Sequence, residues 1–522
     1  MTTAWVWVWA WAMINTPSTA ATDMISTHQK GRPVLRRAAL TPLIVVFFGG
    51  MNLSLIQWVL VREMTALLLG TELIVLLVSV SYFVGLSIGY QLAGRIRQTW
   101  LIPLAIITLV LHLTLPIWFR LLVAELNAVK AYALAFLILP LLTPFIISAF
   151  YSIFLPLFAD QNEGGLPKLY AFEVLGSAVG IGVLVGLGSA GLPAIYLVYA
   201  VSLLLILSAL GLKIWAVVLL SVASISWLMI LPAVNNWSNT FWYKALQGLP
   251  DGTTTLFSGY SPYQKVDVLE SPSGSRYLYL DGLNHFGTYD GQRLNVVSGQ
   301  IPASLTSPKN ALVFGAGSMQ MAAMIADFSG HVTTVELDPL VVEVSRNYFQ
   351  YVNRLDTLSN RSIILDDAKH FIANSRDQFD FVATDLPAAY SIQTATLYSA
   401  PFYRAIKEHL SPGGVFVANL TSPFTADDMI SRRIVASLLE NFAEVMVVTP
   451  RSVGWSFAYA SDHLPFDRVT FESALRNSGE TEYVIYETPA VRVFVGQARP
   501  ITLDTMDIAL EVSLDWIKQR LH

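Results

Sequence analysis

Residues 310–338 have the sequence NALVFGAGSMQMAAMIADFSGHVTTVELD, and they decide the fold of the C-terminal half of the chain. The apolar run NALVF is typical of a buried strand, a helical pattern follows it, and HVTTVE is a second strand. The same alternation continues through the strand-like segments SIIL, FDFVAT and GVFVAN. Strands that alternate with helices favour a parallel sheet covered on both faces. We therefore predict an α/β, Rossmann-like domain over residues 305–465.

The residues before this domain predict a membrane region. Hydrophobic residues make up 54% of the chain and charged residues only 13%, and the apolar ones concentrate before Val234. A helix of about 20 apolar residues is long enough to cross the hydrocarbon core of a bilayer. We predict a multispan α-helical domain over residues 40–234 in the inner (plasma) membrane, with about seven helices near 40–61, 73–93, 101–119, 131–158, 169–189, 191–211 and 214–234. Glycines within several of these runs predict close helix packing.

Three further segments complete the predicted domain organisation. Residues 1–39 begin with the run AWVWVWAWAM, which is too short to span a bilayer and is either an interfacial anchor or a poorly ordered start. Residues 235–304 are a linker and a small β subdomain, because alternating segments such as KVDVLE and RYLYLDG flank the turn SPSGS. Residues 466–522 form a C-terminal extension whose role the sequence does not disclose.

Charged residues near the predicted spans leave two questions open. Glu63 and Glu173 are either functional carboxylates within the membrane or side chains that reach its surface. The distribution of Lys and Arg places the N-terminal segment, the loop with Arg95 and Arg97, Lys168 and Lys213 on the cytoplasmic side. Seven spans would then place the C-terminal domain outside the cell.

Composition also excludes several classes of site. The net charge is −5 and no cluster of Lys and Arg is interleaved with aromatic residues, so the sequence argues against nucleic-acid binding. The chain contains no cysteine, which excludes disulfides, thiol chemistry and Cys-ligated zinc. The histidines show no ligand spacing, so we expect no metal.

Polar residues gather where the predicted parallel strands end, which is where such sheets bind ligands. Gly315 and Gly317 follow the first strand and allow a nucleoside to approach the backbone. Glu336 ends the second strand, where a carboxylate can accept hydrogen bonds from ribose hydroxyls. The remaining acids at strand ends are Asp366 and Asp367, suited to an adenine amino group, and Asp385. Each acid alone could equally be a solvated strand end or a helix cap.

The stretch from Tyr260 to Thr421 contains the motifs SPYQKVDV, YLYLDG, GAGSMQ, VELDP, DDA and ATDLP. With these motifs it resembles the spermidine synthase family of aminopropyltransferases. The resemblance implies a membrane-anchored transferase that moves an aminopropyl-type group from decarboxylated S-adenosylmethionine, or S-adenosylmethionine itself, to a small-molecule amine and releases methylthioadenosine. It implies donor binding by Gln264, Glu336, Asp366 and Asp367 with the loop residues Gly315, Gly317 and Ser318. Soluble relatives are commonly dimers, so a homodimer is expected.

The resemblance also implies that Asp385 is the catalytic residue. It would orient the attacking amine and take its proton, because an ammonium has no lone pair with which to attack. The donor is made in the cytoplasm, so we expect the catalytic domain there despite the distribution of Lys and Arg.

The sequence departs from the family pattern around the amine. Ser318 and Ala388 stand where the family carries acids, and its tyrosine-histidine pair falls on Leu294 and Asn295. The residues expected to bind the nucleoside are therefore present, whereas the family's residues around the amine are largely replaced. Candidate replacement contacts, each equally consistent with packing or turn chemistry, are Tyr263, Asp281, His285, Tyr289, Asp290, Tyr390 and Tyr398.

Two other functions stay open at this point. The first is transfer of a methyl or aminocarboxypropyl group from intact S-adenosylmethionine, which the loss of the acid at Ser318 permits. The second is a polyamine carrier or sensor with a non-catalytic nucleoside-binding domain, against which the scarcity of charges within the predicted spans argues.

Overall fold

The computed structural model describes residues 41–68, 71–159, 165–187, 191–288, 290–315, 317–451, 454–505 and 507–521. It divides into two compact units. The first comprises residues 41–60, 79–116 and 141–232, and the second comprises residues 61–78, 117–140 and 233–521. The predicted segment 1–39 lies outside the described residues.

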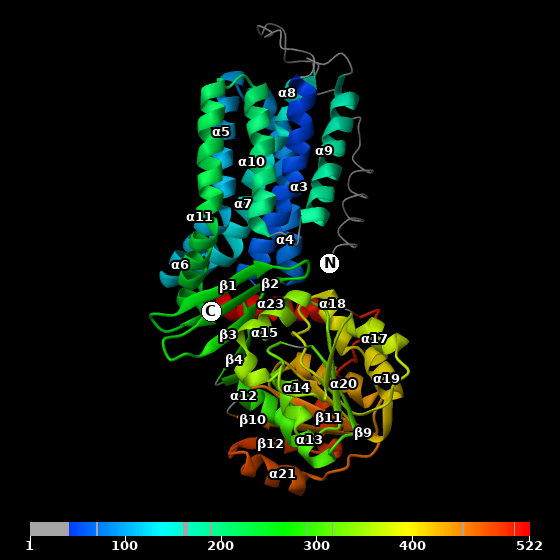
Figure 1. The fold of residues 1–522 in the computed structure, drawn as a ribbon. Coiled ribbons are helices and arrows are strands. Elements are labelled where there is room, and N and C mark those ends of the chain that lie inside the picture. Colours follow the sequence, from blue (N-terminus) through cyan, green and yellow to red (C-terminus); the bar gives the residue numbers. More distant parts are fainter. Residues whose placement is uncertain are drawn as a thin grey trace. The chain divides into compact units, whose positions relative to one another are not determined.

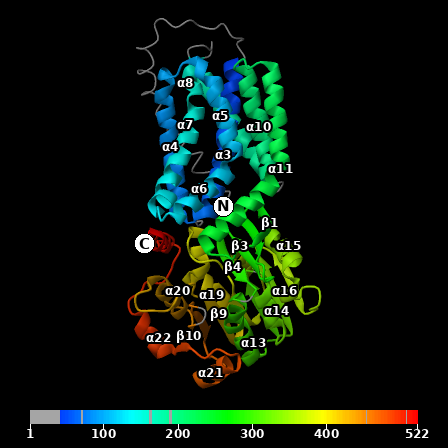
Figure 2. The ribbon, with the colours of Figure 1, turned by 90° about the vertical axis from the view of Figure 1, so that its left-hand side faces the viewer.

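The first unit is helical where it is described. Helices α3, α5, α7 and α10 run side by side in two perpendicular views (Figure 1 and Figure 2). Its helices, several of which extend past the bounds of the unit, are α3 (Thr41–Leu68), α4 (Glu72–Leu92), η1 (Ala93–Arg95), η2 (Gln98–Trp100), α5 (Leu101–Leu113), α7 (Leu139–Ser152), α8 (Phe154–Ala159), α9 (Gly165–Leu187), α10 (Leu192–Ala209) and α11 (Ile214–Gln247).

Six of the described helices are long and apolar enough to cross a membrane. A seventh candidate is the pair formed by residues 98–113 and 115–128, which bends by 68°. The predicted span 101–119 is therefore not one straight helix. Pro116 follows the break and lacks the backbone N–H that would continue the hydrogen-bond ladder, which accounts for the bend.

Glycines bring helix backbones of the first unit together, as the sequence predicts. A Cβ atom on Gly50 of α3 would lie 2.1 Å from the carbonyl oxygen of Glu173 in α9, and one on Gly176 would lie 1.9 Å from that of Phe47. A Cβ atom on Gly85 of α4 would lie 2.3 Å from the carbonyl oxygen of Phe145 in α7. These contacts leave no space for a side chain at the crossing points.

A four-stranded antiparallel sheet opens the main part of the second unit. Its strands are β1 (Thr254–Tyr260), β2 (Lys265–Glu270), β3 (Arg276–Leu280) and β4 (Leu283–Gly287), paired in chain order. The turn between β3 and β4 places Asp281 at φ +46° and Gly282 at φ +77°. Two left-handed residues in a row make the tight hairpin turn for which an Asp-Gly pair is suited.

An eight-stranded sheet forms the centre of the second unit, in the order β12-β10-β11-β9-β8-β5-β6-β7. Strands β5 to β9 are parallel, which confirms the predicted α/β fold, and the last three pair antiparallel. The strands are β5 (Asn310–Phe314), β6 (His331–Glu336), β7 (Arg361–Leu365), β8 (Phe379–Thr384), β9 (Leu410–Asn419), β10 (Glu444–Pro450), β11 (Phe457–Ser461) and β12 (Tyr483–Tyr486).

Helices cover both faces of this sheet. Along β5, Leu312 and Phe314 join one buried apolar cluster, whereas Ala311 and Val313 join another, because successive side chains of a strand point to opposite faces.

The remaining helices are α6 (Leu115–Ala128), η3 (Leu134–Ile138), α12 (Asp290–Asn295), η5 (Val296–Gln300), α13 (Ile301–Thr306), α14 (Gln320–Ala326), α15 (Pro339–Tyr348), α16 (Gln350–Asn353), α17 (Ala368–Asn374), α18 (Ile392–Ala395), η6 (Thr396–Tyr398), α19 (Ala400–Glu408), α20 (Met429–Leu439), α21 (Arg468–Asn477), α22 (Thr488–Val495) and α23 (Ile508–Leu521).

A buried ion pair joins helix ends of the second unit to its small sheet. Arg120 of α6 and Glu63 of α3 are 0% and 1% exposed, and Nη2 of Arg120 donates to both Glu63 oxygens at 2.9 and 2.8 Å. Nη1 of Arg120 donates to Oδ1 of Asn235 at 2.7 Å. The hydroxyl of Tyr260, at the end of β1, donates to Glu63. Glu63 is thus paired within the second unit, and sequence analysis missed Arg120 as its partner.

Candidate active site

The candidate site lies where the strand order of the large sheet reverses. Strand β5 lies between β6 and β8, and the chain passes from β5 to β6 on one side and returns to β8 on the other. Such switch points are where open α/β sheets bind ligands. Gly315 and Gly317 follow β5, and Asp385 follows β8.

The glycine loop packs directly on Asp385. A Cβ atom on Gly315 would lie 2.2 Å from the carbonyl oxygen of Asp385, and one on Gly317 would lie 3.3 Å from its carboxylate Oδ2. The two glycines have φ of +86° and +45°, which side chains rarely adopt. The backbone amide of Asp385 donates to the carbonyl oxygen of Phe314 at 2.8 Å. The structure therefore brings together the ends of the first and fourth predicted strands.

Asp385 has the environment of a proton acceptor. Its side chain is half-buried, and burial raises the pKa of its carboxyl to about 6. The loop that follows it is fixed by Tyr398, whose hydroxyl donates to the carbonyl oxygens of Leu386 and Pro387 at 3.1 and 3.0 Å. Tyr398 thus contacts the backbone beside Asp385. At pH 7 the carboxyl is still mostly ionised, and it is a stronger base than an ordinary aspartate.

Asp385 lines a cavity of about 370 Å³, a size typical of small-molecule sites. His285 of β4 and Tyr390 line the same cavity. Burial lowers the pKa of His285 to about 4, so its ring is neutral at pH 7 and does not repel a cation. Burial also raises the pKa of Tyr390, so it keeps its hydroxyl proton. Two predicted amine contacts are therefore placed beside Asp385.

The pKa of Asp385 predicts how kcat/KM depends on pH. A general base works only when it is deprotonated, so we expect kcat/KM to fall about tenfold per pH unit below pH 6 and to level off above it. Initial rates between pH 4.5 and 8 at low substrate concentrations would measure this. A kcat/KM that rises as the pH falls below 6 would contradict the assignment of Asp385 as base.

The predicted donor-binding residues meet at the ends of β6 and β7. Glu336 is 9% exposed, and its Oε1 accepts a hydrogen bond from the backbone amide of Asp338 at 2.8 Å. Asp338 is buried, and its Oδ2 accepts from Nε2 of Gln264 at 3.1 Å and from the hydroxyl of Ser261 at 2.6 Å. Its Oδ1 caps α15 by accepting from the amide of Leu340 at 3.0 Å. Asp338 thus connects Gln264 with the loop of Glu336.

Asp366 and Asp367 follow β7 next to Glu336. The amide of Asp366 donates to the carbonyl oxygen of Glu336 at 3.0 Å, and its carboxylate lies 2.8 Å from Nδ1 of His370. Oδ1 of Asp367 accepts from the amide of Lys369 at 2.8 Å and caps α17. Asp367 is therefore a helix cap, which is one of the alternatives that the sequence left open. Its contact with adenine stays a prediction.

Other predicted residues whose side chains the structure describes do not line the cavity at Asp385. Oδ1 of Asp281 accepts from the amide of Lys265 at 2.8 Å within the hairpin, and burial raises the pKa of Asp281 to about 6. The amide of Tyr263 donates to Oγ of Ser261 at 3.0 Å. Ser318 is buried and its hydroxyl oxygen accepts from the amide of Gln320 at 3.3 Å. Tyr289 and the side chain of Asp290 lie outside what the structure describes.

Sequence analysis missed several residues that line the cavity. Asn419 ends β9, and its Oδ1 accepts from the amide of Thr421 at 2.8 Å. The strand-end rule applied to GVFVAN would have found it. Three others come from segments without a recognisable motif: Thr71, Trp455 and Asp515.

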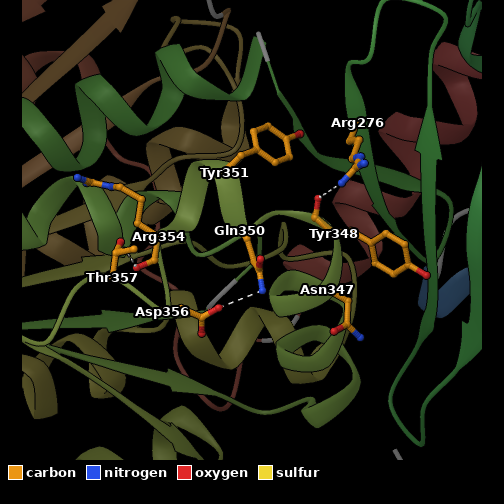
Figure 3. Close-up of a pocket in the computed structure, with 8 residues that line it drawn as sticks. All are labelled: Arg276, Asn347, Tyr348, Gln350, Tyr351, Arg354, Asp356 and Thr357. Carbon is orange, nitrogen blue, oxygen red and sulfur yellow. Dashed lines mark hydrogen bonds between the residues drawn. The ribbon is translucent and has the colours of Figure 1, made fainter.

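A second cavity, of about 480 Å³, lies beside α15 and α16 and is lined by Arg276 and Tyr351 among others (Figure 3). Nη1 of Arg276 donates to the carbonyl oxygen of Tyr348 at 2.7 Å, and Nε donates to Glu270 at 2.6 Å. Nη2 of Arg354 pairs with Asp327 at 2.8 Å. These charges are engaged within the protein, and the predicted site residues lie elsewhere.

Comparison with known proteins identifies similar chains. The family model described as the spermine/spermidine synthase domain matches residues 296–470. A polyamine aminopropyltransferase of Oceanobacillus iheyensis is 30% identical over 215 residues, which cover 38% of this chain and 41% of that protein. One of Thermoplasma acidophilum is 26% identical over 236 residues, covering 44% of this chain and 86% of that protein.

A solved structure gives a weaker likeness. The crystal structure of spermidine synthase from Thermotoga maritima matches at 20% identity with a TM-score of 0.37, covering 49% of this chain and 87% of that one. At that TM-score the likeness does not by itself establish a common fold.

Proposed function

We propose that this protein transfers an aminopropyl group from a sulfonium nucleoside to an amine, because residues 296–470 match the family model of the spermine/spermidine synthase domain. The observation that carries the proposal is Asp385. It lies at the switch point of the sheet, against the glycine loop, and lines a cavity large enough for a small amine.

The chemistry follows from the placement of that carboxylate. The nitrogen lone pair of the acceptor attacks the carbon next to the sulfonium, and the carbon–sulfur bond breaks. Sulfur keeps the bonding electrons and becomes the neutral thioether of methylthioadenosine. Asp385 takes the proton that the nitrogen must lose. The glycine loop, which packs against Asp385, is proposed to contact the nucleoside.

The donor is proposed to bind at the ends of β6 and β7. Glu336 is suited to the ribose hydroxyls, and the acids after β7 are suited to the adenine amino group. Gln264 is held toward this region by Asp338. We propose decarboxylated S-adenosylmethionine as the donor. Ser318 leaves the loop without an acid that would repel the carboxylate of intact S-adenosylmethionine, so both donors need to be tested.

A turnover assay tests the proposed function. The purified full-length protein would be incubated separately with S-adenosylmethionine and its decarboxylated form, each with and without putrescine. We expect methylthioadenosine only from the decarboxylated donor and only with the amine. Methylthioadenosine from intact S-adenosylmethionine would point to aminocarboxypropyl transfer, and S-adenosylhomocysteine would point to methyl transfer. Absence of any nucleoside product would contradict the proposal.

We also propose that the apolar helices cross the inner membrane and that the transferase domain lies in the cytoplasm, where its donor is made. Six helices, or seven with the bent pair, are long and apolar enough to cross. Residues 61–78, which include the start of α4, belong to the same unit as the transferase domain, whereas Arg97 follows the far end of α4. This proposal therefore places Arg97 outside the cell, against the distribution of Lys and Arg.

Single cysteines would decide the orientation, because the chain has none of its own. We expect a cysteine replacing Arg476, which is exposed on α21, to react with a membrane-impermeant maleimide only after lysis. A cysteine replacing Arg97, also exposed, is expected to react in intact cells. The reverse pattern would place the domain outside.

A further inference from the structure

The cavity at Asp385 is lined by a second acidic residue, Asp515, an exposed residue of the C-terminal helix. Among the described residues that line it, Asp385 and Asp515 are the only acids, and neither Lys nor Arg lines it. Ala388, where the resemblance implies a further acid, also lines the cavity. The position that the family pattern would fill with a carboxylate is thus apolar, and the additional acid in the lining belongs to α23.

Helix α23 is held in place beside the cavity. Its residues Ile508, Ala509 and Ser513 are at most 1% exposed, and the helix packs against α18 and α20. Arg433 of α20 is 4% exposed and donates from Nη1 to Oε2 of Glu511 at 2.9 Å. The start of α23 is therefore anchored by a mostly buried cation.

The contacts with Arg433 also fix which side of α23, including Asp515, faces the cavity. Nη2 of Arg433 also donates to Oδ1 of Asp507 at 2.8 Å, just before the helix begins. Residues three or four apart lie on one side of a helix. Asp515 is four residues after Glu511 and three after Val512, and Val512 lines the cavity with it. The cavity wall therefore includes a defined turn of α23.

A diamine acceptor needs such a second carboxylate. Its attacking amine must lose a proton to Asp385, but its remote amine stays an ammonium at neutral pH. Much of the cavity wall is apolar, with Leu283, Phe286 and Met321 among its side chains. A cation in such surroundings requires an opposite charge. His285 is neutral and cannot oppose it.

We propose that Asp515 determines acceptor specificity by binding the remote ammonium of a diamine while Asp385 takes the proton of the attacking amine. This inference rests on the proposed aminopropyl transfer and extends it, since it assigns a residue that determines acceptor specificity and gives the C-terminal extension a role. Asp515 acts on binding of the acceptor and leaves the transfer step to Asp385.

The test compares a diamine with a monoamine of similar length. With putrescine, Asp515→Asn is expected to raise KM for the acceptor by about 10–100-fold, the range for a lost charged hydrogen bond, with kcat changed less than about threefold. With butylamine, which lacks the second ammonium, KM is expected to be the same in the variant and the wild type. Asp515→Glu should restore part of the affinity for putrescine.

A matched control separates this effect from a general disturbance of the extension. Asp504 is an exposed aspartate of the same segment that does not line the cavity, so Asp504→Asn should leave both KM values unchanged. An unchanged KM for putrescine in Asp515→Asn would overturn the inference. So would an equal rise for putrescine and butylamine, because that would show a structural role. Absence of turnover by the wild-type protein with either amine would instead overturn the proposed function, and the inference with it.

Discussion

Replacing Asp385 by Asn is expected to lower kcat by about 10²–10⁴-fold, the contribution typical of a positioned general base. The amide has nearly the shape of the carboxylate but cannot take a proton from an ammonium. The substitution leaves the glycine loop unchanged, and also the residues at the ends of β6 and β7 that are proposed to bind the nucleoside. Methylthioadenosine should therefore bind with the wild-type Kd. Turnover and calorimetric binding, measured on the same preparation, would show both effects.

Asp377→Asn is the matched control for this experiment. Asp377 is exposed just before β8 and its carboxyl lies outside the cavity. We expect wild-type turnover from it. Wild-type turnover from Asp385→Asn would remove the central residue from the mechanism. Loss of nucleoside binding together with turnover would show that Asp385 supports the site structurally.

The largest effect on stability is expected from Arg120→Met. The substitution leaves Glu63 buried without its cation, and breaking a buried pair in this way costs about 3–5 kcal/mol. The ion pair joins α3 and α6 to Tyr260 of the small sheet. The loss should therefore reach the small sheet, in which His285 lies on β4 and Gln264 directly precedes β2. Denaturant titration of the full-length protein in detergent would measure the loss in the free energy of unfolding.

A double variant identifies the cause of that loss. Arg120→Met combined with Glu63→Gln removes the unpaired charge, so we expect it to be more stable than Arg120→Met alone. Arg95→Met, at an exposed position of η1, should have the stability of the wild type. If Arg120→Met is as stable as the wild type, the buried pair does not hold the helix ends to the small sheet.

The sequence predicted the α/β domain well because its signals are local. Each parallel strand is a short apolar run, and the acids and glycines at the strand ends follow from chain order alone. The resemblance to the spermidine synthase family is confirmed by the match over residues 296–470. The bend before α6 was missed, although Pro116 is a signal for it.

The partners of these residues could not be predicted in the same way. Arg120 is 57 residues from Glu63 in the chain, and only the tertiary fold brings them together. Asp515 lies 130 residues beyond Asp385, on a helix without a motif. Asp338 could have been found, since an aspartate before Pro339 is a good helix cap, but its bond to Gln264 depends on packing.

The central claim is that an aminopropyl group moves to an amine with Asp385 as the base. Its most direct test uses decarboxylated S-adenosylmethionine labelled with ¹³C in the aminopropyl chain, incubated with putrescine and either the wild-type protein or Asp385→Asn. We predict that the wild type transfers the whole labelled chain to putrescine and releases one unlabelled methylthioadenosine per product, while the variant transfers almost none. Label retained on the nucleoside, or equal transfer by the two proteins, would contradict the account.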